Sequence, residues 1–231
     1  MLKRNQIFRA VFILLGLLYF NASWSQQSKV KNLLTFDDKP YHFGYLLGVN
    51  QMLFTIKTDQ NTIGAKPALG FTIGVISDLR LGNYFNLRFI PNLQFGERVL
   101  TSWNSSTNAD DEYRYSSVLL NLPLNLKIKG KRLQNMRPYI LVGSSLSVDV
   151  GGNAKKDAST NTADFLLYRN DVYVDTGVGM DFYFNWFKMS TELKMSYGLS
   201  NMFLSPGTNN PRANDITGLN SKVFQFNITI E

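Results

Sequence analysis

The chain has 231 residues, no cysteine and a formal net charge of +7, and hydrophobic residues make up 44% of it. This apolar content, with 13% aromatic residues, excludes an intrinsically disordered chain. The absence of cysteine excludes disulfides and thiolate metal sites. A slightly negative mean hydropathy argues against a helical membrane protein, because such a protein needs several long apolar segments.

The one long apolar run lies at the N-terminus. A short cationic segment that ends at Arg9 precedes the uncharged stretch 10–20, and Ser23 and Ser25 are small residues suited to a cut before Gln26. This layout predicts a cleaved secretory signal peptide over residues 1–25. An uncleaved anchor is the alternative, but about a dozen apolar residues are few for a bilayer span.

Cleavage would remove three basic residues and no acidic ones, so the net charge would fall from +7 to +4. We expect no nucleic-acid partner, because the basic residues of this secreted chain are spread along the sequence. Residues 26–40 are predicted to form a short periplasmic extension. The one basic cluster is predicted to be a solvated turn; it consists of Lys127, Lys129, Lys131, Arg132 and Arg137.

Alternating apolar residues between Val172 and Leu199 give the strongest structural signal. Apolar side chains occupy nearly every second position of 172–184 and again of 187–199, with Asn185-Trp186 between the two stretches. A period of two indicates a β-strand with one apolar and one polar face. Strands of this length cross a bilayer at a tilt. The pattern therefore predicts a transmembrane β-barrel with a polar interior.

Six further segments alternate in the same way, which gives eight strands and an all-β fold. They are residues 41–56, 69–79, 85–95, 118–128, 139–150 and 223–231. Near Gln51 the apolar residues change to even positions, so a bulge or register change is expected there. Pro91 and Pro123 lie inside strands, and each is expected to cause a bulge or a local break in pairing, because proline lacks the ladder donor.

The connections between these strands alternate in length. Those at 82–84, 129–136 and 185–186 are short or medium, whereas those at 57–67, 101–115, 151–170 and 200–221 are moderate or long. Outer-membrane barrels place short turns on the periplasmic side and long loops outside. The sequence therefore predicts an eight-stranded antiparallel outer-membrane barrel over residues 41–231, which contacts outer-membrane lipid.

A soluble, lipocalin-like barrel is the main structural alternative, and it would turn its apolar face inward around a ligand. The polar face here is dominated by Gly, Asn, Ser and Thr, which suits a narrow, hydrogen-bonded lumen. Aromatic residues also gather at the strand ends, as in the interfacial girdle of a membrane barrel. Both features favour the membrane barrel.

Charged residues on the polar face define the candidate site. Eight strands leave an interior just wide enough for side chains, and unpaired buried ions are costly. We therefore expect a salt-bridge network that plugs the lumen, rather than an ion channel, with Asp181 and Lys188 as a diagonal pair across the hairpin. The predicted network consists of Arg88, Asp175, Asp181, Lys188, Glu192 and Lys194, and Lys127 also faces inward.

His42 is the only histidine, and it lies at the periplasmic start of the first strand. A general base is one hypothesis, but nothing in the sequence places a serine and an acid beside it. One histidine also provides no imidazole cluster for a metal. We expect a hydrogen-bonding role for His42, with no catalytic residue, cofactor or metal in the chain.

Three segments resemble the PorT family of outer-membrane proteins of Bacteroidota. They are Phe36–Gly44 (FDDKPYHFG), Leu119–Lys127 (LLNLPLNLK) and Gly177–Leu199 (GVGMDFYFNWFKMSTELKMSYGL). The resemblance implies an eight-stranded outer-membrane barrel that is required by the type IX secretion system and, in some species, by gliding motility. It also implies a non-catalytic role through contacts with a larger translocon. The alternatives are a generic porin-like or adhesin-like barrel without a secretion role, and a membrane-embedded enzyme.

Overall fold

The computed structural model describes residues 31–58, 63–104, 109–151, 166–167, 170–201, 203–204 and 216–231. The predicted signal peptide, residues 1–25, lies outside the described residues. The strands are β1 (Tyr41–Thr58), β2 (Ile63–Lys66), β3 (Ala68–Arg80), β4 (Phe85–Phe89), β5 (Asn92–Asn104), β6 (Ala109–Lys129), β7 (Met136–Asp149), β8 (Leu166–Leu167), β9 (Asn170–Tyr183), β10 (Lys188–Gly198), β11 (Phe203–Leu204) and β12 (Ile216–Ile230), and a 3-10 turn, η2 (Phe36–Asp38), precedes them.

The strands form a closed, antiparallel, eight-stranded barrel, as predicted. Each of the eight positions in the ring is called a stave, because two consecutive strands can share one position. β2 with β3 forms one stave and β4 with β5 another, and β1 closes the ring by pairing with both β12 and β3. β8 and β11 form a separate two-stranded sheet. Among the residues described, no helix is both long and apolar enough to cross a membrane.

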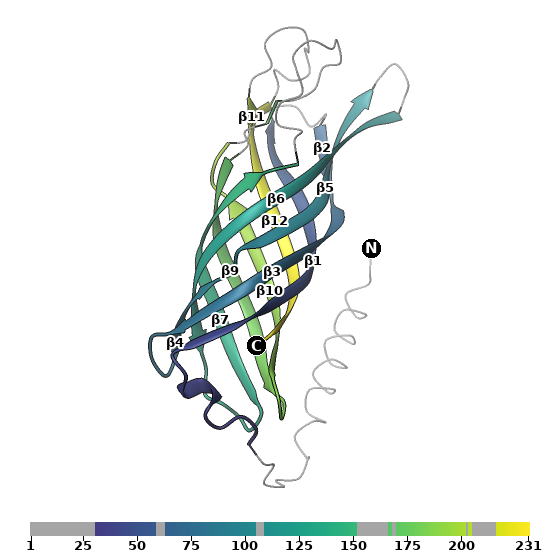
Figure 1. Cartoon of the computed structure of the whole chain (residues 1–231). Helices are drawn as coiled ribbons and strands as arrows, with labels where there is room; N and C mark the ends of the chain where they lie inside the picture. Colours follow the sequence, from purple (N-terminus) through teal and green to yellow (C-terminus); the bar gives the residue numbers. More distant parts are fainter. Residues whose placement is uncertain are drawn as a thin grey trace, which may run out of the picture. The chain divides into compact units, whose positions relative to one another are not determined.

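The two ends of the barrel differ. The β3–β4, β6–β7 and β9–β10 connections have four to six residues and lie at the lower end in Figure 1, where η2 also lies. The two long connections, between β7 and β9 and between β10 and β12, leave the strands at their opposite ends. Because outer-membrane barrels keep their short turns in the periplasm, the lower end is the periplasmic end.

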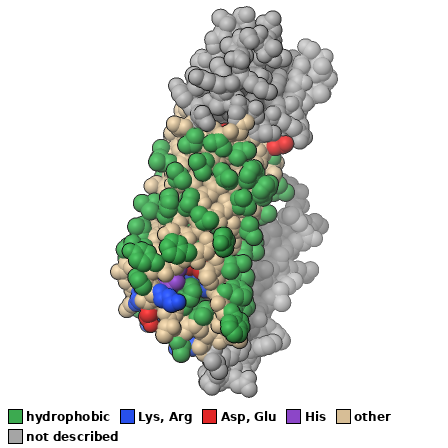
Figure 2. All heavy atoms as spheres, viewed as in Figure 1, with side chains coloured by type: hydrophobic (Ala, Val, Ile, Leu, Met, Phe, Trp, Pro, Cys, Tyr) green, Lys and Arg blue, Asp and Glu red, His purple; other side chains and the backbone are tan. Residues whose placement is uncertain are grey.

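The barrel has an apolar outside and a polar inside. Outward side chains such as Tyr45 (71% exposed) and Leu193 (59% exposed) form the wall, while Asn125 (0% exposed) and Glu192 (1% exposed) point inward. Figure 2 shows apolar side chains spread over the wall between its two ends. This arrangement is the reverse of a soluble barrel, and it confirms the faces predicted from the alternation.

The bulge predicted near Gln51 does not occur. β1 stays in register with β3 as far as Met52 and with β12 as far as Lys57. Met52 remains on the inner face and is fully buried, because the lumen contains an apolar layer at this height. That layer comprises Met52, Leu119, Tyr173 and Val223.

The two strand prolines share one break in the ladder. Pro91 interrupts its stave, so that β4 ends at Phe89 and β5 begins at Asn92. Pro123 faces this gap, while on its other side it stays in register with Ser145 of β7. Across this gap the Ile90 amide donates a long hydrogen bond, of 3.4 Å, to the Pro123 carbonyl. The local break expected at each proline is therefore a single gap between neighbouring staves.

The connection predicted over 101–115 is mostly strand. β5 and β6 stay paired as far as Asn104 and Ala109. The prediction missed this part of the two strands because residues 101–115 do not alternate apolar and polar side chains.

Candidate functional site

Arg88 of β4 lies at the centre of the charged lumen, with its side chain fully buried. Its guanidinium Nη2 contacts Asp78 Oδ2 at 2.7 Å and Glu231 Oε1 at 2.7 Å, and its Nη1 lies 3.9 Å from Glu192 Oε2. Asn86 donates a further hydrogen bond to Asp78 Oδ1 at 2.5 Å. Arg88 Nε also donates to Asp78 Oδ2 at 2.8 Å, so the planar, five-donor guanidinium binds several carboxylates at once.

The diagonal pair predicted between Asp181 and Lys188 is wrong. Asp181 instead pairs with Lys127 of β6 (Nζ–Oδ1 2.7 Å) and accepts a hydrogen bond from Ser190 Oγ at 2.6 Å. Lys188 pairs with Glu231 at 2.6 Å. The predicted hairpin register is right, with Asp181 opposite Ser190. Lys188 meets Glu231 directly opposite, beyond the end of the neighbouring strand β12, and Lys127 reaches Asp181 past the one intervening strand, β7.

Tyr139 of β7 links the ions around Arg88 to the Lys127–Asp181 pair. Its hydroxyl donates to Glu192 Oε2 at 3.0 Å, and the Lys127 ammonium lies 3.9 Å from the centre of its ring. Its cross-strand neighbour is Gly179, where a Cβ would lie 2.3 Å from Tyr139 Cζ. Glycine at this position therefore makes room for the ring in the lumen.

Two of the six predicted residues lie apart from this cluster. Lys194 Nζ contacts Asp175 Oδ2 at 2.8 Å, and Ser145 Oγ donates to Asp175 Oδ1 at 3.3 Å. The structure thus places all six predicted residues inside the barrel, in two groups: one around Arg88 and Lys127, and one formed by Lys194 and Asp175.

Asp78 and Glu231 were absent from the predicted network, although both bind Arg88. The alternation does assign both residues to the polar face. Asp78 falls on the polar positions of residues 69–79, and Glu231 follows Asn227 and Thr229 on the polar face of the last strand. Both lie near strand ends, where alternation by itself does not tell a lumen side chain from a solvated one.

The basic cluster predicted to be a solvated turn is largely buried. Lys127 is 0%, Lys129 5% and Arg137 7% exposed, and Lys131 remains exposed. Arg137 donates to the carbonyl oxygens of Gly130 and Asn83 at 2.9 and 2.6 Å. It thereby ties together two periplasmic turns.

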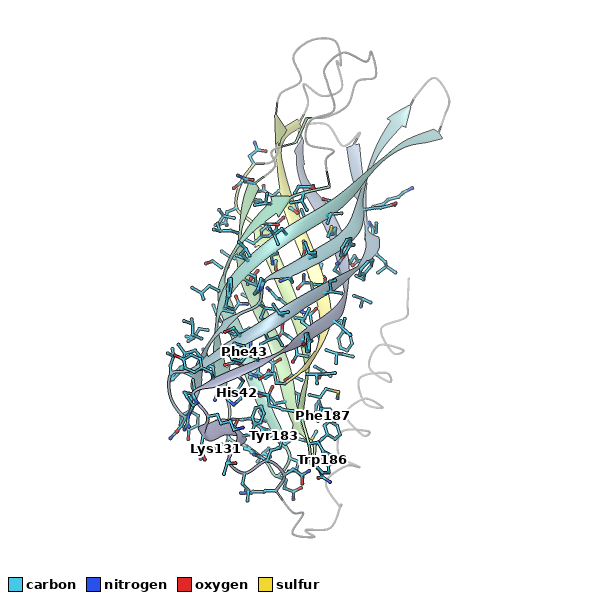
Figure 3. The ribbon with its side chains drawn as sticks, viewed as in Figure 1. His42, Phe43, Lys131, Tyr183, Trp186 and Phe187 are labelled. Carbon is cyan, nitrogen blue, oxygen red and sulfur yellow. The ribbon has the colours of Figure 1, made fainter. Side chains whose placement is uncertain are left out.

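Residues 32–38, part of the predicted extension, lie against these turns. Asp37 accepts a hydrogen bond from Arg137 Nη1 at 3.1 Å and bonds from the Tyr183 hydroxyl at 3.0 and 2.9 Å. His42, which is 7% exposed, donates from Nε2 to the Phe36 carbonyl at 2.7 Å, and its ring stacks on Phe36 with centroids 4.3 Å apart. Figure 3 places His42 and Tyr183 at the same end of the barrel as η2. The groups that bind residues 32–38 at this end are called the periplasmic mouth; they are His42, Arg132, Asn135, Arg137, Tyr183 and Lys188.

The family model described as outer membrane protein beta-barrel domain matches residues 24–204, more than half of the chain. The chain belongs to this family. This outer membrane barrel therefore resides in the outer membrane, where its apolar wall contacts lipid. No curated protein matches the sequence.

Several solved structures are similar to this outer membrane barrel at low identity. Neisserial surface protein A (NspA) is 8% identical, with 83% of this chain and 99% of that one covered and a TM-score of 0.42. Ail, the attachment invasion locus protein of Yersinia pestis, is 10% identical, with 83% and 98% covered and a TM-score of 0.36. The outer membrane protein AlkL is 13% identical, with 91% and 94% covered and a TM-score of 0.39. Similarity at this low level says nothing about the function of this chain.

Proposed function

We propose that this outer membrane barrel is a non-catalytic component of the type IX secretion system and acts through contacts with a larger translocon. The proposal extends to gliding motility in species that couple the two processes. Its support is the resemblance of Phe36–Gly44, Leu119–Lys127 and Gly177–Leu199 to the PorT family of Bacteroidota.

The observation that carries a contact role is the closed interior. The side chains of Arg88 and Lys127 have no surface open to water, and the eight-stave ring leaves room for little more than side chains. A folded cargo protein could not pass such a lumen. A role in its export would therefore use the outside of the barrel: the lipid-facing wall, the outer connections or the periplasmic mouth.

Deletion of the gene tests the secretion role. We expect cargo proteins that carry the C-terminal signal domain to accumulate in the periplasm, and wild-type complementation to restore their export. Immunoblots of periplasm and culture medium would measure both, with a periplasmic enzyme as the control for leakage. Normal export in the deletion strain would refute the proposal.

A generic small barrel without a secretion role is the second candidate, because every feature of the fold is compatible with it. Affinity purification from native membranes separates the two. Co-purification of a large outer-membrane translocon would support the secretion role, whereas recovery of the barrel by itself, together with normal export, would favour the generic barrel.

A further inference from the structure

The periplasmic mouth contacts two consecutive side chains, Phe36 and Asp37, with groups from the start of β1, the β6–β7 connection, β7 and the β9–β10 hairpin. Asp37 lies between the Tyr183 hydroxyl and two guanidinium groups, with Arg137 Nη1 at 3.1 Å and Arg132 Nη1 at 3.9 Å. The Phe36 ring stacks on the imidazole of His42, with centroids 4.3 Å apart, and the ammonium of Lys188 lies 4.8 Å from the centre of the same ring. One position is therefore built for a carboxylate and the next for an aromatic ring.

The mouth also binds the main chain of this segment. The Asn135 side chain accepts a hydrogen bond from the Asn32 amide at 2.8 Å, and the Arg132 guanidinium donates to the carbonyl oxygens of Asn32 and Leu33. These partners belong to the β6–β7 connection, about a hundred residues away in the sequence. Proteins bind a peptide of irregular structure in this way, through side chains that form hydrogen bonds with its successive backbone groups.

The conformation of the segment depends on the mouth. η2 has only three residues, and its N-terminus has no side-chain cap. Leu33 adopts a φ of 48°, and Gln134 on the opposing turn a φ of 54°. Arg132 donates to the carbonyl oxygens of both residues. Non-glycine residues stay in the left-handed region only when their surroundings hold them there.

We infer that the periplasmic mouth is a peptide-binding site for an aromatic residue followed by aspartate, and that residues 32–38 occupy it as a tethered ligand. Tethering gives the segment an effective concentration of order millimolar. A partner peptide of the same chemistry must therefore exceed that value, or be tethered itself, to displace it. The site lies at the periplasmic end, so this partner would be a periplasmic segment of another protein. The inference holds for a barrel with or without a secretion role.

A full-length variant whose segment lacks the two bound side chains, called the emptied variant below, provides the test. Phe36→Ser combined with Asp37→Ser removes both gripped side chains, and circular dichroism with heat-modifiable gel migration checks that the barrel still forms. The probe is a fluorescent peptide with the sequence of residues 31–40, followed by anisotropy in detergent. We expect the emptied variant to bind it at least about tenfold more tightly than the wild type, in which the tethered segment competes.

Two neighbouring aspartates provide the matched control. A probe with Asp37→Asn should bind the emptied variant about tenfold more weakly, because it loses the negative charge that pairs with Arg137 and Arg132 and strengthens the bond from the Tyr183 hydroxyl. A probe with Asp38→Asn should bind almost as well as the original, since the Asp38 side chain is 71% exposed and its ion pair is with Arg80. Arg137→Ala in the emptied variant should weaken the original probe.

The NMR resonances of His42 can show whether the site is occupied in the intact protein, because His42 is the only histidine of the chain. The stacked Phe36 ring should shift the imidazole resonances of the wild-type protein, and Phe36→Ala should remove that shift. The original peptide, added to Phe36→Ala, should restore it, and this single variant serves if the double variant does not fold. Failure of the emptied barrel to bind the peptide, or equal binding of the Asp37→Asn probe, would make the segment an ordinary part of the fold and overturn the inference.

Discussion

At the residue scale, the contact between Tyr139 and Gly179 determines how the charged lumen is filled. A Cβ at Gly179 would lie 2.3 Å from Tyr139 Cζ and 2.8 Å from the Thr191 carbonyl oxygen. Gly179→Ala should therefore displace the ring and lower the free energy of unfolding by about 1–3 kcal/mol. Urea titration in lipid vesicles measures this. Gly82→Ala is the control, since a Cβ there meets nothing within 4 Å; equal stability of both variants would contradict the packing described.

At the scale of the element, the gap between β4 and β5 is the weak place in the ladder. Pro91 and Pro123 provide no amide donors, and the Ile90 amide makes only the long 3.4 Å bond to Pro123. We expect residues 89–92 to exchange amide hydrogens faster than residues 139–142, which pair without interruption with both β6 and β9. Hydrogen exchange in nanodiscs, read by NMR, measures the difference, because local opening follows local pairing. Similar protection of the two stretches would show that the gap is not a weak point.

At the scale of the whole molecule, the apolar wall is what requires a bilayer. Leu193 lies near the middle of β10 and is 59% exposed. Leu193→Arg should destabilise the barrel by about 2–4 kcal/mol, as a cation at the midplane of an outer-membrane barrel does. Leu81→Arg, in the β3–β4 turn where Leu81 is 58% exposed, should change stability by about 0–1 kcal/mol. The same unfolding titration compares them, and a harmless Leu193→Arg would mean that the wall does not face lipid.

The sequence by itself determined the barrel, its two faces and the positions of its short turns. Period-two alternation assigns each side chain to one face, and the bilayer makes that assignment strict, because a polar residue in contact with acyl chains is costly. The hairpin of β9 and β10 could be read to the residue for this reason. Alternation was misleading at Met52, where the lumen itself contains an apolar layer. It is missing from residues 101–115, so the far ends of β5 and β6 were not predicted.

Only the tertiary structure decided which charges meet. Asp78 lies opposite Arg88 in the β3–β4 hairpin, but Glu231 reaches Arg88 only because β1 closes the ring by pairing with both β12 and β3, which no local pattern reveals. The same holds for Asp37, whose partners Arg137 and Tyr183 are about 100 and 146 residues away in sequence. A strand pattern specifies the face of a side chain, but its partner across the lumen follows from the stave order and the register of all eight staves together.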